Sequence, residues 1–252
     1  MKHLIKKNHS LIILSLLLTL AYVYAIFLSS NTHFLTYIEN VAYDLRLNLT
    51  LPNQKNQQIV ILDIDEKSLA NEGRWPWPRD RIAHLVDLLF DHYGIAVLAF
   101  DVVFAEPDNN PGIDSLAKLA KQQLPDADAF LQNMHTLSSQ INRDQQLADS
   151  FIDRPVILGY YFQNDGTMNL GLKTGQLPFP VLPVKEAGLD ALPLLDAQGY
   201  GANIAILQEN AIAGGFFDNP DWTSDGIIRS VPLVTAFEGN LYESLALATT
   251  RT

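Results

Sequence analysis

Residues 59–101, IVILDIDEKSLANEGRWPWPRDRIAHLVDLLFDHYGIAVLAFD, decide the fold. Two apolar runs, 59–65 and 95–101, each end in aspartate, a pattern typical of strands buried on both faces of a parallel sheet. Between them, apolar residues recur at helical spacing from residue 82 to residue 93, and Gly94 marks the end of the helix. Strand, helix and strand of this length predict a βαβ unit with a right-handed crossover.

A stiff aromatic loop, GRWPWPRD at 73–80, follows the first predicted strand. Its two prolines restrict their own φ and hold the preceding tryptophans toward extended conformations. Ligands of open α/β sheets bind beyond the carboxyl ends of the strands, where this loop and the terminal aspartates meet. The candidate ligand site therefore comprises Asp63, Asp65, Trp75, Trp77, Arg79 and Asp101.

Arg79 is expected to form an ion pair with Asp63, Asp65 or Asp101, because a bidentate arginine–carboxylate contact would hold the loop over the strand ends. The alternative is that the tryptophans only fasten the loop to the core and that nothing binds there.

The run LIILSLLLTLAYVYAIFL at 11–28 carries no charged residue and approaches the roughly 20 apolar residues that span a bilayer as a helix. Three lysines precede it, and the first acidic residue of the chain is Glu39. The positive-inside rule then predicts a cytoplasmic N-terminus at 1–10, a transmembrane helix at 11–28 and export of everything that follows. A cleaved signal peptide is the alternative, since Val23-Tyr24-Ala25 would suit a signal peptidase.

The exported part divides at residue 58. Helical spacing from Phe34 to Leu45 predicts a helix at 31–50, so 29–58 forms a juxtamembrane helix and a polar linker. Residues 59–252 form the main domain, for which the pattern predicts an α/β fold: a mostly parallel central sheet flanked by helices. Its further strands are expected at 155–161, 211–217 and 226–237, and its further helices at 113–124, 126–151 and from 244 onward.

Composition excludes several classes of function. The chain has 28 Asp and Glu against 17 Lys and Arg, and three of those lysines precede the apolar run. So acidic a domain has no basic surface to neutralise phosphates, and we predict no nucleic-acid partner. It has no cysteine, which rules out disulfides, zinc–thiolate sites and thiol nucleophiles. We predict no cofactor, no metal and no catalytic residue.

One enzymatic alternative remains. A buried strand followed by Asp63-Ile64-Asp65 resembles the opening of haloacid-dehalogenase-type phosphatases, in which the first aspartate attacks phosphorus and Mg²⁺ bridges the two. Lys67 stands where that family has threonine or a small residue, and no serine or threonine follows the second predicted strand. A purely structural or dimerising domain without a ligand is the second alternative.

A wider resemblance spans nearly the whole chain. The anchor is followed by YDLRLNL at 43–49, by DIDEKSL at 63–69 with WPWPR at 75–79, by FDVVFAEPD at 100–108, and later by SDGIIRSVPLV and YESLALA. This order resembles the type 2 CHASE domain, the extracellular sensor of bacterial cyclase and histidine-kinase receptors. Positions of the chain that match the family pattern are Asp63, Asp65, Glu66, Trp77, Pro78, Arg79, Asp101 and Pro107, which adds Glu66 to the candidate ligand site.

The resemblance implies a signal-input role rather than catalysis. It implies that 59–252 is an extracytoplasmic, periplasmic sensor domain anchored in the inner membrane, and that the receptor works as a homodimer. It also implies that this chain is the N-terminal part of a longer receptor, whose output module would be an adenylate or guanylate cyclase, a diguanylate cyclase or a histidine kinase. The stimulus would be a small molecule or a physical change that the resemblance does not specify.

Overall fold

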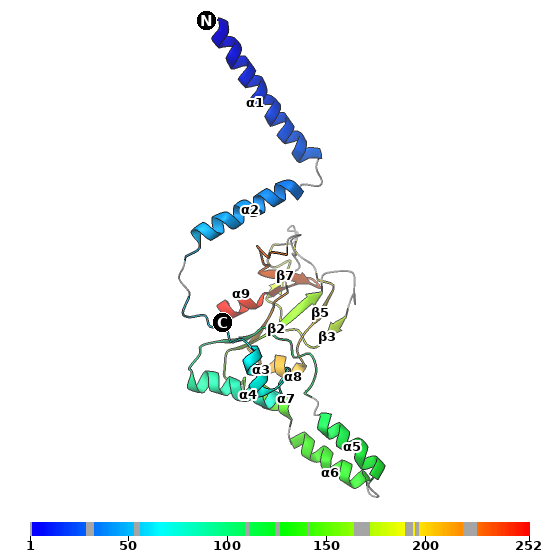
Figure 1. Ribbon diagram of the computed structural model, residues 1–252. Helices are drawn as coiled ribbons and strands as arrows, with labels where there is room; N and C mark the ends of the chain where they lie inside the picture. Colours follow the sequence, from blue (N-terminus) through cyan, green and yellow to red (C-terminus); the bar gives the residue numbers. More distant parts are fainter. Residues whose placement is uncertain are drawn as a thin grey trace. The chain divides into compact units, whose positions relative to one another are not determined.

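The computed structural model describes residues 2–28, 33–52, 56–108, 111–123, 127–140, 142–163, 172–189, 194, 197–218 and 226–252. These residues group into two compact units, Met1–Asp63 and Ile64–Thr252. Figure 1 labels most of the elements. The helices are α1 (Lys2–Leu28), α2 (His33–Thr50), α3 (Glu66–Glu72), α4 (Arg79–Asp87) with the π-helical turn η1 (Leu88–His92), α5 (Pro111–Gln123), α6 (Ala127–Gln140), α7 (Arg143–Asp149), α8 (Ala205–Asn210) and α9 (Leu245–Arg251).

The first unit consists of the two N-terminal helices. The helix predicted at 31–50 is confirmed as α2. The predicted membrane span at 11–28 falls on α1. Among the described residues, however, no helix is both long enough and apolar enough to cross a membrane. The transmembrane helix therefore remains a prediction from the sequence.

The strand predicted at 59–65 is wrong. These residues have no regular secondary structure, and Ile59, Val60 and Ile61 are 71%, 83% and 88% exposed. An apolar run becomes a strand only when a neighbouring strand satisfies its backbone groups, and in the described residues β1 pairs with β2 alone. The end of the run has another role, because the side chain of Asp65 caps the N-terminus of α3.

The main sheet is mostly parallel, as predicted. Its strands are β1 (Leu98–Phe100), β2 (Val156–Gln163), β3 (Lys173–Thr174), β5 (Gly199–Gly201) and β6 (Ala213–Phe216). β2 lies at the centre and pairs in parallel with β1 on one side and with β6 on the other. Its last three residues pair antiparallel with β5, which in turn pairs in parallel with β3. A second, antiparallel sheet joins β4 (Leu182–Pro183), β8 (Asn240–Glu243) and β7 (Val234–Phe237).

Two hydrophobic cores lie along β2. The first gathers apolar side chains of α4, α7 and α8 against the first half of the strand, and Figure 1 shows these three helices clustered together. The second is aromatic: Phe162 of β2 lies with its ring centroid 5.3–5.9 Å from those of Tyr160, Phe216, Phe237 and Tyr242. Such tilted and edge-to-face rings add to the stabilisation from burial alone.

The other predicted elements are confirmed in part. The strand predicted at 155–161 is β2, that at 211–217 is β6, and the helix expected from 244 is α9, capped by Ser244. Of 226–237, only Val234–Phe237 is a strand. The helix predicted at 126–151 is two helices, α6 and α7, because Asn142 stops the first and caps the second by accepting a hydrogen bond from the Gln145 backbone.

Candidate functional site

The aromatic loop is ordered against the first core, as its two prolines predict. Trp75 and Trp77 are half-buried, and their rings meet edge to face with centroids 5.8 Å apart. The indole N–H of Trp77 donates to the Gly73 carbonyl at 2.9 Å, which closes the loop on itself. Gly73 has φ +92°, a conformation that side chains rarely adopt. The loop therefore delivers the chain to the start of α4 with little freedom.

Arg79, the first residue of α4, is only 8% exposed. Its guanidinium lies over the Phe104 ring, 4.4 Å from the centroid, and Nη2 donates to the Glu106 carbonyl at 3.3 Å. Its Nε is 3.6 Å from Oδ1 of Asp144, and its backbone N–H donates to Asp108 Oδ2 at 2.9 Å. One buried cation thus contacts the segment that follows β1 and the start of α7.

Two more residues complete a network that we call the stem cluster: Arg79, Asp80, Asp108, Arg143 and Asp144. The Asp108 backbone donates to Asp144 Oδ2 at 3.0 Å. Arg143 contacts both Asp108 (3.8 Å) and Asp80 (3.3 Å). Asp108 lies just before α5, and Arg143 and Asp144 open α7 just after α6. The stem cluster therefore ties both ends of the α5–α6 hairpin to the first turn of α4.

Burial governs the electrostatics of this cluster. Loss of water raises the pKa of Asp144, although the hydrogen bond from Asp108 and the charge of Arg79 oppose the rise. Burial also lowers the pKa of Arg79, against the raising effect of Asp144 and Asp108. Arg79 Nε and Asp144 Oδ1 are buried without a hydrogen bond at those atoms, so they compensate each other as charges alone. Neither can lose its partner without leaving a buried, uncompensated charge.

The structure does not bring all of the predicted site residues together. Trp75, Trp77 and Arg79 are contiguous, whereas Asp63, Glu66 and Asp101 are exposed. Asp65, also exposed, accepts from the Ser68 backbone at 2.8 Å and from the Ser68 hydroxyl at 2.6 Å, and these hydrogen bonds lower its pKa. The predicted partners of Arg79 were wrong, since its ion pair is with Asp144.

Sequence reasoning missed Asp108, Arg143 and Asp144. Asp108 closes the FAEPD segment, and its position in a predicted turn drew attention to the chain reversal rather than to its carboxylate. Nothing in the local pattern of α7 indicates that Asp144 faces Arg79, because the two residues are far apart in the chain and meet only through packing of α4 on α7.

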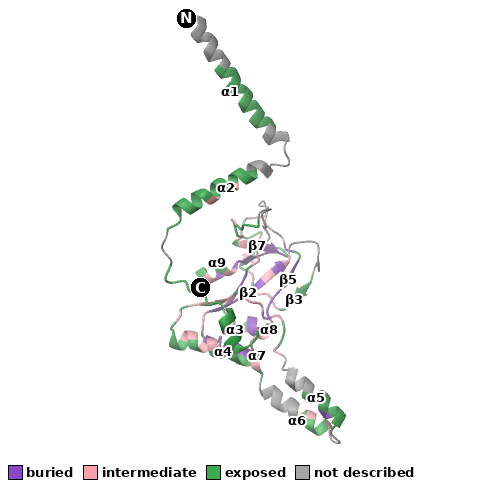
Figure 2. Ribbon diagram, viewed as in Figure 1, coloured by how far each residue is buried: buried purple, intermediate pink, exposed green. Residues whose placement is uncertain are grey.

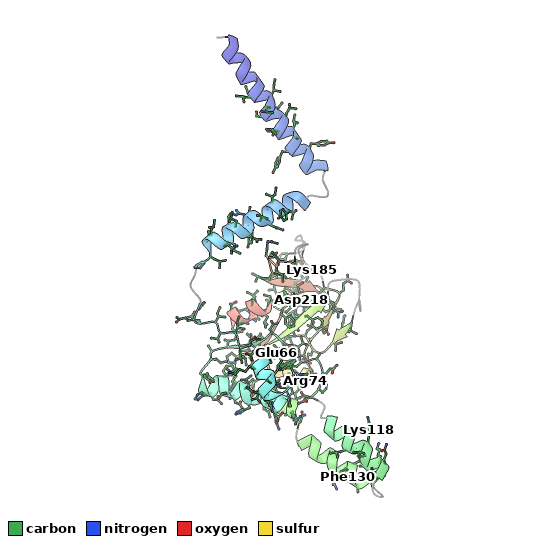
Figure 3. All side chains as sticks on the ribbon, in the orientation of Figure 1. Glu66, Arg74, Lys118, Phe130, Lys185 and Asp218 are labelled. Carbon is green, nitrogen blue, oxygen red and sulfur yellow. The ribbon has the colours of Figure 1, made fainter. Side chains whose placement is uncertain are left out.

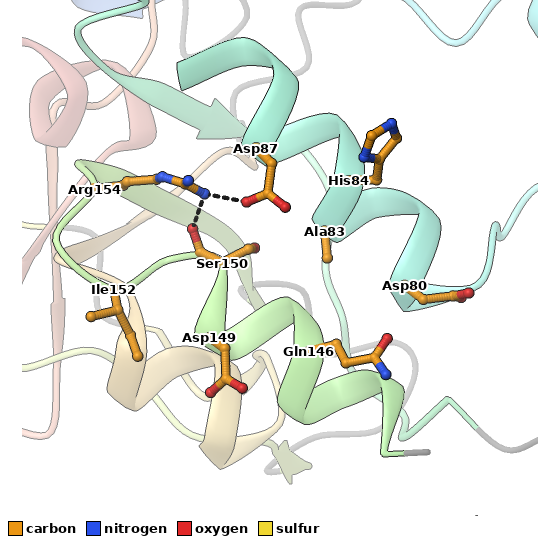
Figure 4. A pocket seen from close by; sticks show the side chains of 9 residues that line it. All are labelled: Asp80, Ala83, His84, Asp87, Gln146, Asp149, Ser150, Ile152 and Arg154. Carbon is orange, nitrogen blue, oxygen red and sulfur yellow. Dashed lines mark hydrogen bonds and ion pairs between the residues drawn. The ribbon is translucent and has the colours of Figure 1, made fainter. Parts of the chain in front are cut away.

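A groove of about 440 Å³ runs beside the stem cluster, between α4 and the end of α7 (Figure 4). Arg154 lies at one end of it, held by Asp87, by Asp91 at 2.9 Å and by the Ser150 carbonyl at 2.9 Å. The groove is polar, and its lining residues are Asp80, Ala83, His84, Asp87, Gln146, Asp149, Ser150, Ile152 and Arg154. In the described part of the chain, no three His, Asp or Glu side chains are placed to hold a metal ion.

The fold and the site together define a mixed α/β domain in which a buried arginine ties an inserted helical hairpin to the core. The family model of the CHASE2 domain matches residues 16–252. The chain therefore belongs to the CHASE2 family, whose members are extracellular sensor domains of membrane receptors. Searches among curated proteins and among solved structures gave no match.

Proposed function

We propose that this chain is the extracytoplasmic signal-input region of a bacterial transmembrane receptor. The observation that carries the proposal is the CHASE2 match over residues 16–252, which includes the apolar run as well as the α/β domain. In this proposal residues 11–28 anchor the chain in the inner membrane, the lysines before them stay cytoplasmic, and the α/β domain is periplasmic. The output module, a nucleotide cyclase, a diguanylate cyclase or a histidine kinase, lies outside this chain.

The stem cluster supports the proposal because a sensor needs an element that can take two arrangements. A stimulus shifts such an equilibrium only by interacting differently with the two arrangements. Arg79 is held by charges and carbonyls from three segments, so a small displacement of the aromatic loop would change contacts at both ends of the hairpin. We propose that Trp75, Trp77 and Arg79 form the part of the candidate ligand site that registers the stimulus.

The phosphohydrolase alternative is disfavoured by Asp65. In that chemistry the two aspartates must be free to meet a phosphoryl group and Mg²⁺. Here the carboxylate of Asp65 accepts two hydrogen bonds from Ser68 as the N-cap of α3. A phosphatase assay with Mg²⁺ separates the readings: turnover that disappears in Asp63→Asn would establish the hydrolase and refute the signal-input proposal.

The positive test uses the full-length receptor with its own output measured in cells. Alkaline phosphatase joined after residue 58 is expected to be active, because that enzyme folds only outside the cytoplasm; an inactive fusion would refute the export. Asp108→Asn is expected to shift the basal output, since it weakens contacts to Arg79 and Arg143. Glu72→Gln, which touches only the exposed pair with Arg81, is the matched control and is expected to leave the output unchanged.

A further inference from the structure

The α5–α6 hairpin packs its small side chains inside and leaves its large ones outside. Ala120 is 4% exposed, whereas Leu116 and Leu119 of the same helix are 53% and 50% exposed, and Phe130 of α6 is 39% exposed. Figure 2 shows this inversion as a single buried patch on a hairpin that is otherwise exposed where it is described. Alanines bury little apolar area, so the contact between the two helices contributes little stability on its own.

The large side chains share one face of the hairpin. An α-helix turns about 100° per residue, which places Leu116 and Leu119 to one side of the inward-facing Ala120. The same rotation on the antiparallel α6 places Phe130 on that side of the hairpin. We call these three residues the apolar face. The exposed charges of the described hairpin residues, Lys118, Lys121 and Asp128, fall on the opposite side (Figure 3 labels Lys118 and Phe130).

We propose that the apolar face binds the same face of a second copy of this chain, so that two hairpins form a four-helix bundle around a two-fold axis. The chain carries 28 acidic against 17 basic residues, so two copies repel each other over most of their surface. The described residues of the apolar face carry no charge, which makes it a surface where two acidic copies can approach without that repulsion. An isologous contact would bring Leu116 and Leu119 of one copy onto Phe130 of the other.

A lipid surface fits this face less well. Amphipathic helices that lie on membranes place lysine and arginine around the apolar stripe, where they meet anionic headgroups. Here Lys118 and Lys121 lie on the side away from the apolar face. A bilayer would therefore cover the leucines without engaging either lysine.

The size of the face indicates a weak, reversible contact. Helices of this length are about 20 Å long at 1.5 Å per residue, and two of them 8–10 Å apart present a face about 20 Å wide. Pairing would cover about 400 Å² on each copy, below the roughly 800 Å² per partner of a standard stable interface. The stem cluster compensates in part, because it fixes both ends of the hairpin before pairing and so lowers the ordering cost.

Disulfide crosslinking of the full chain in detergent tests the interface, and the chain has no cysteine of its own to interfere. Leu119→Cys is expected to give a covalent dimer under mild oxidation, and mixing Leu119→Cys with Phe130→Cys is expected to give a mixed disulfide. Lys118→Cys, one residue away on the opposite side, is the matched control and is expected to crosslink at least about tenfold less.

Equal crosslinking at positions 118 and 119, or none at 119 and 130 with retained helical circular dichroism, would overturn the proposal. The second measurement is sedimentation: Leu119→Asp is expected to weaken self-association, whereas Lys118→Asp leaves it unchanged. Both tests report on pairing alone. A receptor whose output never changes, in a chain that still crosslinks through position 119, would contradict the proposed function and leave this interface standing.

Discussion

Replacing Arg79 by alanine removes a buried cation and leaves Asp144 uncompensated. The guanidinium is shielded from water, and it contacts the Asp144 carboxylate, the Glu106 carbonyl and the Phe104 ring. Breaking a buried ion pair from one side costs about 3–5 kcal/mol. In a domain of this size each kcal/mol lowers the melting temperature by about 2–4 °C, so the expected loss is roughly 6–20 °C.

Arg81 provides a matched control two residues further along α4. Its ion pair with Glu72 is exposed, with side chains 45% and 52% accessible and the charges 3.1 Å apart. Exposed pairs contribute about 0–1 kcal/mol, so Arg81→Ala is expected to lower the melting temperature by less than about 4 °C. Both variants change helix propensity alike, since each introduces alanine into the first turn of the same helix.

Thermal melts followed by circular dichroism provide the assay, and a double variant sharpens it. Removing Asp144 together with Arg79 takes away the orphaned charge, so the double alanine variant is expected to lose less stability than the two single variants combined, by about 0.5–3 kcal/mol. Equal losses for Arg79→Ala and Arg81→Ala, or strict additivity of Arg79→Ala and Asp144→Ala, would show that the stem cluster is not a buried network.

Three further predictions concern the core and its titration. Asn203→Ala is expected to lower the free energy of unfolding by about 2–4 kcal/mol in urea melts, because the fully buried amide serves the Phe104 N–H at 2.8 Å and a β2 carbonyl at 3.0 Å. Gly215→Ala is expected to lower the melting temperature, since its Cβ would lie 2.4 Å from Leu245 Cα; an unchanged melt would refute that packing. Burial raises the pKa of Asp218 above its ordinary value near 3.8, so this group stabilises the fold most at acid pH, and its contribution is lost as pH rises through the raised pKa. Asp218→Asn is expected to abolish that part of the pH dependence in urea titrations between pH 3 and 7, and an unaltered pH profile would contradict it.

Some elements followed from local pattern alone. The apolar run at 155–161 predicted β2, and that strand is buried along nearly its whole length, as a continuous run requires. The spacing after Asp80 predicted α4, whose inward residues are Ile82, Ala83 and Val86. In both cases the period of the side chains is the physical cause of the element, so the sequence carries the information directly.

Other features depended on partners that no local pattern names. Residues 59–62 have the composition of a buried strand and lie exposed, because a strand also needs a neighbour. Arg79 was predicted to be paired, and it is, but with Asp144, which packing of α7 brings into range. For the candidate ligand site, the sequence located the aromatic loop and its arginine, whereas the carboxylates around that arginine come from a distant helix and from the segment before α5.

The central strand β2 has a mechanical consequence for the domain. Its first residues form the parallel sheet with β1 and β6, and its last three residues form the antiparallel ladder with β5. The helical core rests on the first stretch and the aromatic core on the second. Tension applied to either core is therefore transmitted to the other through one covalent strand of eight residues, so the two cores cannot slide past each other without tearing the same row of hydrogen bonds. A pull on this domain is expected to be resisted by both cores as one body and to end in a single rupture.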